Sequence, residues 1–471
     1  MDAHIWMGSR QIVAQKYSER VSPYDGRVVS RFAHCDAHDA HDALVIAQKA
    51  AKNSKKVPLH QRCAWLLDVA AQLREQREEF AHVLCDEVGK PITYARIEVD
   101  RCIETITLSA ETMRTVHGET INTDAMASGR KAHAYWRRES VGVVVAITPF
   151  NFPLNLVAHK LAPALVAGNS VVLKPTPEAP LCAYKLAQLF IQSPYATPDA
   201  LSVVYGDAEV GSALVSSDIP RVVSFTGSVT VGNIITKNAG IKKVSLELGG
   251  NAATFIDESA DVAYAAARCA MGAFVNAGQV CISLQRIYVD STIYDAFAHK
   301  MGEETAKLVV GSPYHAETFL GPLINDEAAL RAMSWVESAI AQGAKALTPP
   351  RVEGRIFYPC VMTEVTDSMK IVCEEVFAPI VSLVRVNGLK EAIEKMNNSP
   401  FGLQFSVFTN NLAHATYAID ELEAGGVVIN DIPTLRFDIQ PYGGVKLSGV
   451  GREGPRFAIE EFTEIKSVVI L

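Results

Sequence analysis

The feature that most constrains the fold is a regular alternation of short apolar runs and helical segments between residues 141 and 250. The run VGVVVAIT (141–148) is apolar at nearly every position, which is typical of a strand buried on both faces of a parallel sheet. Similar strands are expected at SVVLKP, LSVVYG, RVVSFTG and KKVSLELGG, with helices between them. This spacing predicts βαβ units in a doubly wound, Rossmann-like parallel sheet.

A second α/β stretch covers about 250–430, from NAATFID to GGVVIN. Ahead of the first sheet, helices are expected over 37–52, 60–88 and 92–116, where apolar residues keep helical spacing. The segment 118–138 is polar and turn-rich, and the tail EEFTEIKSVVIL has the character of a strand. We expect a hairpin and an exposed strand suited to pairing between subunits.

Composition excludes several classes of protein. The 471 residues are 49% hydrophobic and 20% charged, which is ordinary for a globular protein and unlike a disordered or coiled-coil chain. The net charge of −8 offers no basic surplus, so nucleic acid is not expected as a partner. The longest apolar region, 161–173, is broken by Pro163 and Gly168, and the N-terminus has no signal-peptide pattern. We therefore expect a cytoplasmic protein with no membrane partner.

Nine cysteines occur without a CxxC pair or a Cys/His metal spacing, which indicates reduced thiols and no metal site. Cys281, in FVNAGQVCISLQR, follows a glycine-containing loop near an expected helix start. Backbone N–H groups can stabilise a thiolate at such a place. The alternative is a buried structural thiol, which is the interpretation given to the other eight cysteines.

Two polar residues stand at the ends of expected strands. Glu247 lies in VSLELGG, where apolar neighbours would raise the pKa of its carboxyl, as a general base requires. A glutamate facing solvent at the strand end is the alternative. Asn151 lies in ITPFNFPLN before an expected helix, where its amide could stabilise an oxyanion. The alternative for Asn151 is a helix N-cap.

Two further segments offer contacts for a phosphorylated ligand. Lys174 closes the strand SVVLKP, and Gly227, Ser228 and Gly232 lie where another strand leads into a helix. Such a turn gives a phosphate a flexible backbone, a hydroxyl and a helix N-terminus. A plain strand-to-helix turn explains the same spacing.

Taken together and in order, these segments resemble the aldehyde dehydrogenase superfamily across essentially the whole chain. The matching motifs are PFNFP, LKP, FTGS, LELGG, GQVC, EEVFAP, NDIPT and PYGGVKLSG. The resemblance implies a cofactor domain (1–117 and 139–248), a catalytic α/β domain (249–435), and a β arm (118–138 and 455–471). In this family the arm joins subunits, so a homodimer or homotetramer is expected.

The resemblance also implies a role for each matching position. Cys281 would be the nucleophile, and the Asn151 amide with the Cys281 backbone N–H would form the oxyanion hole. Glu247 would activate the water that hydrolyses the thioester. The residues expected to hold NAD or NADP are Thr148, Pro149, Phe150, Lys174, Glu178, Gly227, Ser228, Gly232, Leu248, Gly249, Glu375 and Phe377.

Two details bear on the variety of enzyme. Relatives that prefer NAD often carry Glu three residues after the lysine, but this chain has Pro177 there and Glu178 one residue later, which leaves NAD and NADP both open. Relatives that transfer the acyl group to coenzyme A tend to lack a carboxylate at the position of Glu247, so its presence favours hydrolysis. A CoA-acylating enzyme and an inactive scaffold are the alternatives.

The substrate is expected to be a small aldehyde, either a hydroxyaldehyde such as lactaldehyde or an acidic semialdehyde. His159 and Arg436 are the candidates for contacting its polar tail. A packing histidine and a surface salt bridge are the alternatives for these two residues. Val280 stands where relatives that act on phosphorylated or phosphonylated aldehydes often have Arg, which disfavours that substrate class.

Overall fold

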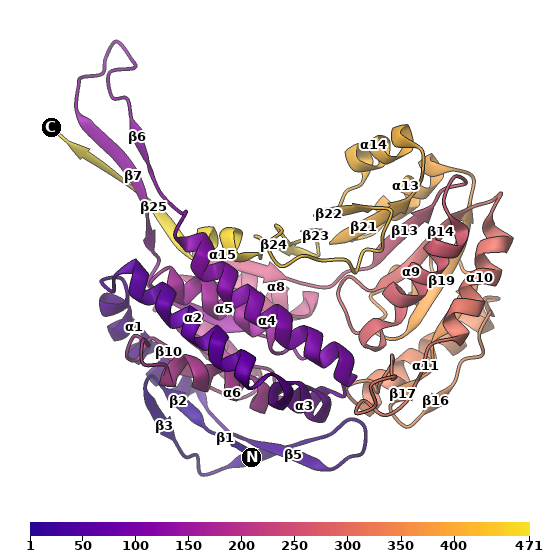
Figure 1. Cartoon of the computed structure of the whole chain (residues 1–471), viewed down its shortest axis with the longest axis horizontal. Coiled ribbons are helices and arrows are strands. Elements are labelled where there is room, and N and C mark those ends of the chain that lie inside the picture. Colours follow the sequence, from indigo (N-terminus) through magenta and orange to yellow (C-terminus); the bar gives the residue numbers. More distant parts are fainter.

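The apolar runs in the middle of the chain form an eight-stranded sheet in the computed structural model, which describes residues 1–471 (Figure 1). Its strands lie in the order β24-β12-β11-β8-β9-β10-β2-β3. The five central strands, from β12 to β10, are parallel to one another, as the buried apolar runs predict. The bounds are β2 Ile5–Met7, β3 Arg10–Ile12, β8 Val143–Ile147, β9 Ser170–Lys174, β10 Leu201–Val203, β11 Val222–Thr226, β12 Lys243–Glu247 and β24 Gly449–Val450.

Nine helices pack around this sheet and share with it a core of 73 buried residues. The expected helix over 60–88 is two helices, because Gln76 has φ −98° and ψ 16° and interrupts the helical geometry between α2 and α3. The bounds are α1 Ala37–Ser54, α2 Leu59–Glu75, α3 Arg77–Val88, α4 Ile92–Met113, α5 Asn155–Val166, α6 Pro180–Gln192, α7 Ala208–Ser216, α8 Val229–Asn238 and α15 Pro455–Glu461.

The strand order reverses at β8, and this reversal positions the site. From β8 the chain continues to β9 and β10 on one side, and then returns to β11 and β12 on the other. In open α/β sheets, ligands bind outside the carboxyl ends of the strands at such a switch point. Residues directly after β8, β9, β11 and β12 are therefore placed to contact a ligand.

The second body contains a seven-stranded sheet in the order β15-β18-β19-β14-β13-β21-β22, parallel except for β15. Its helices enclose two cores of 35 and 12 buried residues, so it is an independent α/β layer, as the sequence predicts. The strands are β13 Ala252–Ile256, β14 Leu284–Asp290, β15 Lys345–Ala346, β18 Cys360–Thr363, β19 Ile380–Val386, β21 Gln404–Phe408 and β22 Gly426–Ile429. The helices are α9 Val262–Phe274, the 3-10 turn η1 Val275–Gly278, α10 Tyr294–Ala306, α11 Asp326–Ala341, α12 Lys370–Cys373, α13 Leu389–Asn397 and α14 Leu412–Glu421.

Four small sheets complete the chain, and one of them is an arm that projects from the first body together with the C-terminus (Figure 1). In the arm, β25 pairs antiparallel with β7, with Thr463 opposite Ser140 and Ile470 opposite His133. The arm strands are β6 Glu119–Ile121, β7 His133–Ser140 and β25 Thr463–Ile470. The other three sheets are small. One contains β1 Asp2–Ala3, β5 Val28–Ala33 and β4 Tyr17–Val21; the second is the hairpin β16 Val352–Glu353 and β17 Ile356–Phe357; the third pairs β20 Phe401–Gly402 with β23 Val445–Lys446.

The C-terminal segment of the arm differs from the bounds expected from the sequence. Ala458 and Ile459 of α15, and Phe462 after it, are buried in the core of the first body. Only the strand from Thr463 onward pairs within the arm. The fold class itself is as predicted, namely two α/β bodies and a small β arm. No helix has the length and apolar character needed to cross a membrane.

Candidate active site

A cavity of about 360 Å³ lies where the strand ends of the first body face loops of the second. Most residues singled out in the sequence line it, namely Pro149, Phe150, Asn151, Gly227, Ser228, Glu247, Leu248, Gly249, Cys281, Glu375, Phe377 and Arg436. Five others lie outside its lining, namely Thr148, His159, Lys174, Glu178 and Gly232. Arg101, Phe152, Tyr442 and Glu453 also line the cavity.

Cys281 is positioned by an unusual turn. Asn276, Ala277 and Gly278 have φ values of 53°, 55° and 70°, so three consecutive residues are left-handed. A Cβ on Gly278 would lie 2.2 Å from the Ala378 carbonyl oxygen, so this position requires glycine. The structure after Cys281 is the strand β14 and not a helix, so the expected helix N-terminus is absent from this site.

The Cys281 thiol is half-buried and makes one side-chain hydrogen bond. Its Sγ lies 3.0 Å from the Tyr442 hydroxyl. Burial raises the pKa of the thiol to about 12, and the bond to Tyr442 opposes that shift. The backbone N–H of Cys281 donates to no acceptor in the chain, which leaves it available to a bound oxygen atom.

Glu247 is the last residue of β12, which pairs with a strand on each side. Its partners across these pairs are Thr226 of β11 and Gly449 of β24. The residue is 3% exposed, and neither carboxylate oxygen has a hydrogen-bond partner. Burial, together with the nearby charge of Glu453, raises the pKa of Glu247 well above its ordinary value. A buried carboxylate without partners is costly, so this arrangement is typical of a functional group.

Asn151 is held in place through its backbone. Its carbonyl oxygen accepts a hydrogen bond from Lys90 Nζ at 2.7 Å, and Lys90 also pairs with the buried Glu98. Glu98 in turn accepts the backbone N–H of Leu154 at 2.9 Å. The side-chain oxygen of Asn151 accepts the Phe152 N–H at 3.1 Å, and its amide nitrogen donates to no protein atom. The free amide and the free Cys281 N–H are the two donors that an oxyanion hole needs.

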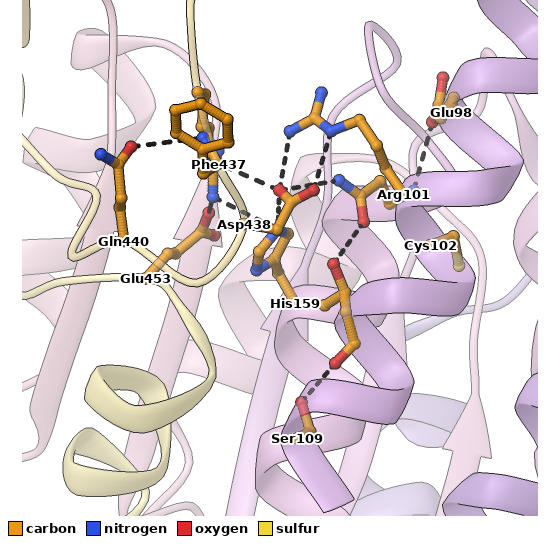
Figure 2. Close-up of polar contacts among 12 residues, drawn as sticks. Glu98, Arg101, Cys102, Ser109, His159, Phe437, Asp438, Gln440 and Glu453 are labelled. Carbon is orange, nitrogen blue, oxygen red and sulfur yellow. Dashed lines mark hydrogen bonds and ion pairs between the residues drawn. The ribbon is translucent and has the colours of Figure 1, made fainter. Parts of the chain in front are cut away.

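Beside the cavity lies a network that we term the charged wall, made of Arg101, His159, Arg436, Asp438 and Glu453. Arg101 donates to both Asp438 oxygens at 2.8 and 2.7 Å, and His159 Nε2 lies 3.0 Å from the same carboxylate (Figure 2). Arg436 donates to Glu453 at 3.2 Å, and its guanidinium carbon lies 3.7 Å from the centre of the Tyr442 ring. Arg101 and Arg436 both line the cavity.

The protonation states within the charged wall follow from these contacts. Burial opposes ionisation of Asp438, but the hydrogen bonds from His159 and Arg101 hold the pKa of its carboxyl far below the ordinary value. Burial and the charge of Arg436 lower the pKa of His159, so the ring is neutral at pH 7. His159 is only 1% exposed and does not line the cavity, which corrects its expected role as a direct substrate contact.

The carboxyl ends of β11 and β12 form a cradle suited to a dinucleotide. Ser228 caps α8 by accepting the Val231 N–H at 3.3 Å, so the positive end of this helix faces the turn. A Cβ on Gly249 would lie 2.5 Å from the Glu375 carboxylate, which shows how closely these segments approach. The Gly250 N–H donates a hydrogen bond to one oxygen of the Glu375 carboxylate at 3.0 Å.

Polar groups without partners extend the cradle along the sheet edge. Lys174, at the end of β9, is 8% exposed, and its ammonium makes no hydrogen bond or ion pair; burial lowers its pKa. The hydroxyls of Thr148 and Thr226 are buried and unpartnered. Glu178 lies near Lys174, and its carboxylate bonds the Thr176 hydroxyl. These free donors fit a ligand that carries hydroxyls and phosphates, such as NAD or NADP.

Aromatic residues flank the other end of the cradle. The rings of Phe150 and Phe377 meet edge to face with centroids 6.0 Å apart. Phe377 has φ 50°, a left-handed conformation that is rare for a bulky residue and often marks a functional position.

Tyr442 and Glu453 are two polar cavity residues that sequence reasoning missed. Tyr442 lies in the PYGGVKLSG motif, and Glu453 follows it closely, but neither was singled out. The sequence does mark both positions, because Tyr442 and Glu453 are polar residues that stand among several glycines. Arg101 lies on the expected helix over 92–116, where a single arginine usually faces solvent.

Comparison with known proteins agrees with this geometry. The family model for the aldehyde dehydrogenase family matches residues 9–468. A 3-sulfolactaldehyde dehydrogenase from Priestia aryabhattai is 42% identical over 464 residues, which cover 98% of this chain and 96% of the relative. A lactaldehyde dehydrogenase from Methanococcus aeolicus is 38% identical over 462 residues, which cover 97% of this chain and 98% of the relative.

Solved structures show the same fold. Aldehyde dehydrogenase 21 from Physcomitrella patens, in complex with the reaction product succinate, has a TM-score of 0.97 and 36% identity, covering 100% of this chain and 98% of that one. NADP-dependent glyceraldehyde-3-phosphate dehydrogenase from Bacillus halodurans, complexed with NADP, has a TM-score of 0.97 and 31% identity, with coverage of 100% and 99%. The chain belongs to the aldehyde dehydrogenase family. As its motifs predict, it is an NAD(P)-dependent aldehyde dehydrogenase.

Proposed function

We propose that this enzyme oxidises a small aldehyde with a polar or acidic tail to the free carboxylic acid, without coenzyme A. The observation that carries the proposal is that Cys281, Glu247 and Asn151 line one cavity. A nucleophile, a base and an oxyanion donor in one site are what thioester chemistry requires, and a binding protein has no need of the set.

In the first half of the reaction, the Cys281 thiolate attacks the aldehyde carbon. The S–C bond forms, and the carbonyl electron pair moves to the oxygen. The Asn151 amide and the Cys281 N–H stabilise the resulting oxyanion. When bound in the cradle, a nicotinamide dinucleotide would supply the acceptor for the hydride that must leave the adduct as the thioester forms. Lys174, Ser228 and Glu375 are the residues proposed to hold it.

In the second half, Glu247 acts as the general base. Its carboxylate takes a proton from water as the water oxygen attacks the thioester carbon, and the C–S bond then breaks to release the acid and the Cys281 thiolate. The raised pKa of Glu247 makes its ionised form a strong base. The same shift predicts that hydrolysis accelerates as the pH rises, because only the ionised carboxylate accepts the proton.

The charged wall supports the preference for a polar tail. Arg101 and Arg436 present two guanidiniums to the cavity, and a neutral His159 adds no further charge. Such groups recognise a carboxylate or sulfonate through charge-assisted hydrogen bonds. The relatives named for 3-sulfolactaldehyde and lactaldehyde point to the same substrate class, as does the structure that contains succinate. The proposed substrates are lactaldehyde, 3-sulfolactaldehyde or an acidic semialdehyde.

The arm supports a second part of the proposal, that the enzyme is a homodimer or homotetramer. Ile465, Val469 and Ile470 on β25 are exposed, and so is Ile121 on β6. An exposed apolar strand in a three-stranded sheet is suited to covering by a second copy of the chain. Sedimentation or light scattering of the intact protein tests this: a monomer would contradict it.

The test of the activity is formation of reduced nicotinamide with lactaldehyde, 3-sulfolactaldehyde, succinate semialdehyde and propanal, with NAD or NADP and no CoA. We expect turnover, with propanal the poorest substrate. Cys281→Ala is expected to reduce turnover at least about 10⁴-fold. The matched control is Cys373→Ala, at the exposed cysteine outside the cavity, which should leave turnover unchanged. Activity that appears only after CoA is added would contradict the hydrolytic mechanism.

A further inference from the structure

The one side-chain group that hydrogen-bonds the Cys281 sulfur has no role in the mechanism above. The Tyr442 hydroxyl lies 3.0 Å from Sγ, and both residues line the cavity. The Tyr442 ring is fixed from two directions. Its backbone exchanges hydrogen bonds with Glu453, at 3.0 and 2.6 Å, and the Arg436 guanidinium covers one face of the ring.

The direction of the hydrogen bond follows from the surroundings of the hydroxyl. Burial holds the pKa of Tyr442 well above its ordinary value, so the phenol keeps its proton near neutral pH. The thiolate is then the acceptor. A cation over the ring face draws electron density from the phenol, which makes its O–H a better donor.

We propose that Tyr442 is a further catalytic residue, whose hydroxyl donates a hydrogen bond to the Cys281 sulfur and stabilises the attacking thiolate. This rests on the proposed role of Cys281 as nucleophile. The thiol proton leaves to water before the attack. During the attack the negative charge moves from sulfur to the aldehyde oxygen, and Tyr442 keeps its proton throughout.

The other groups around the sulfur explain why such a donor is needed. The carboxylates of Glu375 and Glu247 face the thiol and disfavour its ionisation, and burial acts in the same direction. Arg436 favours the thiolate but is already paired with Glu453. Because a strand and not a helix follows Cys281, no helix dipole assists. The Tyr442 hydroxyl is therefore the main compensating contact.

The test is the pH dependence of iodoacetamide alkylation at Cys281, measured by mass spectrometry in the full-length enzyme. In Tyr442→Phe we expect the profile to move upward by about one to two pH units, because a hydrogen bond to a charged group changes ionisation about tenfold to a hundredfold. The more basic thiolate is also more nucleophilic, so alkylation at neutral pH should fall roughly threefold to tenfold. The matched control is Tyr205→Phe, whose buried hydroxyl has no partner and lies outside the cavity; its profile should stay unchanged.

A second variant is expected to shift the pH profile of alkylation in the opposite direction. Replacing Tyr442 by 3-fluorotyrosine makes the phenol more acidic and a stronger donor, so the profile should move below that of the wild type. Unchanged profiles in both variants would overturn the proposal. It would also be overturned if the profile stays unchanged while KM for lactaldehyde rises, because the hydroxyl would then bind substrate. Absence of aldehyde turnover in the wild type would contradict the proposed function alone, since alkylation still reports on the thiol.

Discussion

Glu247 and Asp438 are both carboxylates buried beside the same cavity, and their surroundings differ completely. Glu247 has no hydrogen-bond partner, and burial raises the pKa of its carboxyl. Asp438 accepts hydrogen bonds from Arg101 and His159, and the pKa of its carboxyl is lowered. The Glu247 carboxylate is therefore free to act on a ligand or a water molecule, whereas the Asp438 carboxylate is already bonded to protein groups.

The difference separates two kinds of buried polar group. A group without partners is costly to the fold but is free to exchange a proton or to bind a ligand. A fully bonded group contributes position and charge and takes no part in proton transfer. On this comparison, changes at the reaction centre should alter rates, and changes within the charged wall should alter stability and recognition.

The largest expected effect is at Glu247. Glu247→Gln removes the base while keeping the shape, so steady-state turnover should fall about 10³-fold, within the range of general-base effects. Hydride transfer precedes the blocked step, so stopped-flow absorbance should show a burst of one reduced nicotinamide per active site. Glu258→Gln, at an exposed glutamate, is the control. Loss of the burst together with turnover would place Glu247 in an earlier step.

The next effect tests the charged wall. Asp438→Asn leaves Arg101 without its buried partner and should reduce the free energy of unfolding at pH 7 by about 3 kcal/mol, as measured by urea denaturation. Asp431→Asn breaks the more exposed pair with Arg268 and should cost less than about 1 kcal/mol. Equal losses of unfolding free energy in the two variants would contradict the view that Asp438, unlike Glu247, stabilises the fold through its buried contacts.

The same variant carries a prediction about pH. Because the pKa of Asp438 is lower in the folded protein, its stabilising contribution is complete above its ordinary pKa of 3.8 and is lost as the pH falls below that value. The difference in unfolding free energy between the wild type and Asp438→Asn should therefore shrink on acidification. A difference that grows at low pH would contradict the assigned ionised state.

A smaller effect is expected at Arg436. Arg436→Met removes a guanidinium from the cavity, so kcat/KM for succinate semialdehyde relative to propanal should fall about tenfold to a hundredfold, the contribution of a charge-assisted hydrogen bond. Comparing two aldehydes within one variant cancels any effect on the thiol. An unchanged ratio would assign recognition of the tail to Arg101 or to neither residue.

The smallest effect is expected at Lys174, whose free ammonium lies at the edge of the cradle. Lys174→Met should raise KM for the dinucleotide about fivefold to tenfold with kcat nearly unchanged, because one hydrogen bond to a hydroxyl is lost. Lys237→Met, at an exposed lysine of α8, is the control. A fall in kcat without a change in KM would move Lys174 from binding to chemistry.

The sequence predicted the fold well because its signals are local. Buried parallel strands such as 143–147 are continuous apolar runs, and glycine and proline mark the ends of many helices. The break between α2 and α3 could not be predicted, because Gln76 is neither a glycine nor a proline. The burial of Phe462 could not be predicted either, because it depends on packing against residues that are distant in the sequence.

The candidate site shows the same limit. Motifs placed Cys281, Glu247 and Asn151, and these residues do line one cavity. His159 was expected to contact the substrate, because it lies near Asn151 in the sequence. In the structure its ring instead bonds the carboxylate of Asp438, a residue 279 positions further along the chain. Contacts of that kind depend on tertiary packing, and no local pattern reports them.

Helix α15 joins Glu453 of the charged wall directly to strand β25 of the arm, so the two are parts of one short stretch of chain. A purification tag or fusion partner attached after Leu471 extends the edge strand β25, which α15 connects to Glu453 in the cavity lining. Such an added segment would disturb both the arm and the substrate pocket. The N-terminus lies on the side of the first body away from the arm in Figure 1, so a tag attached there extends away from the arm.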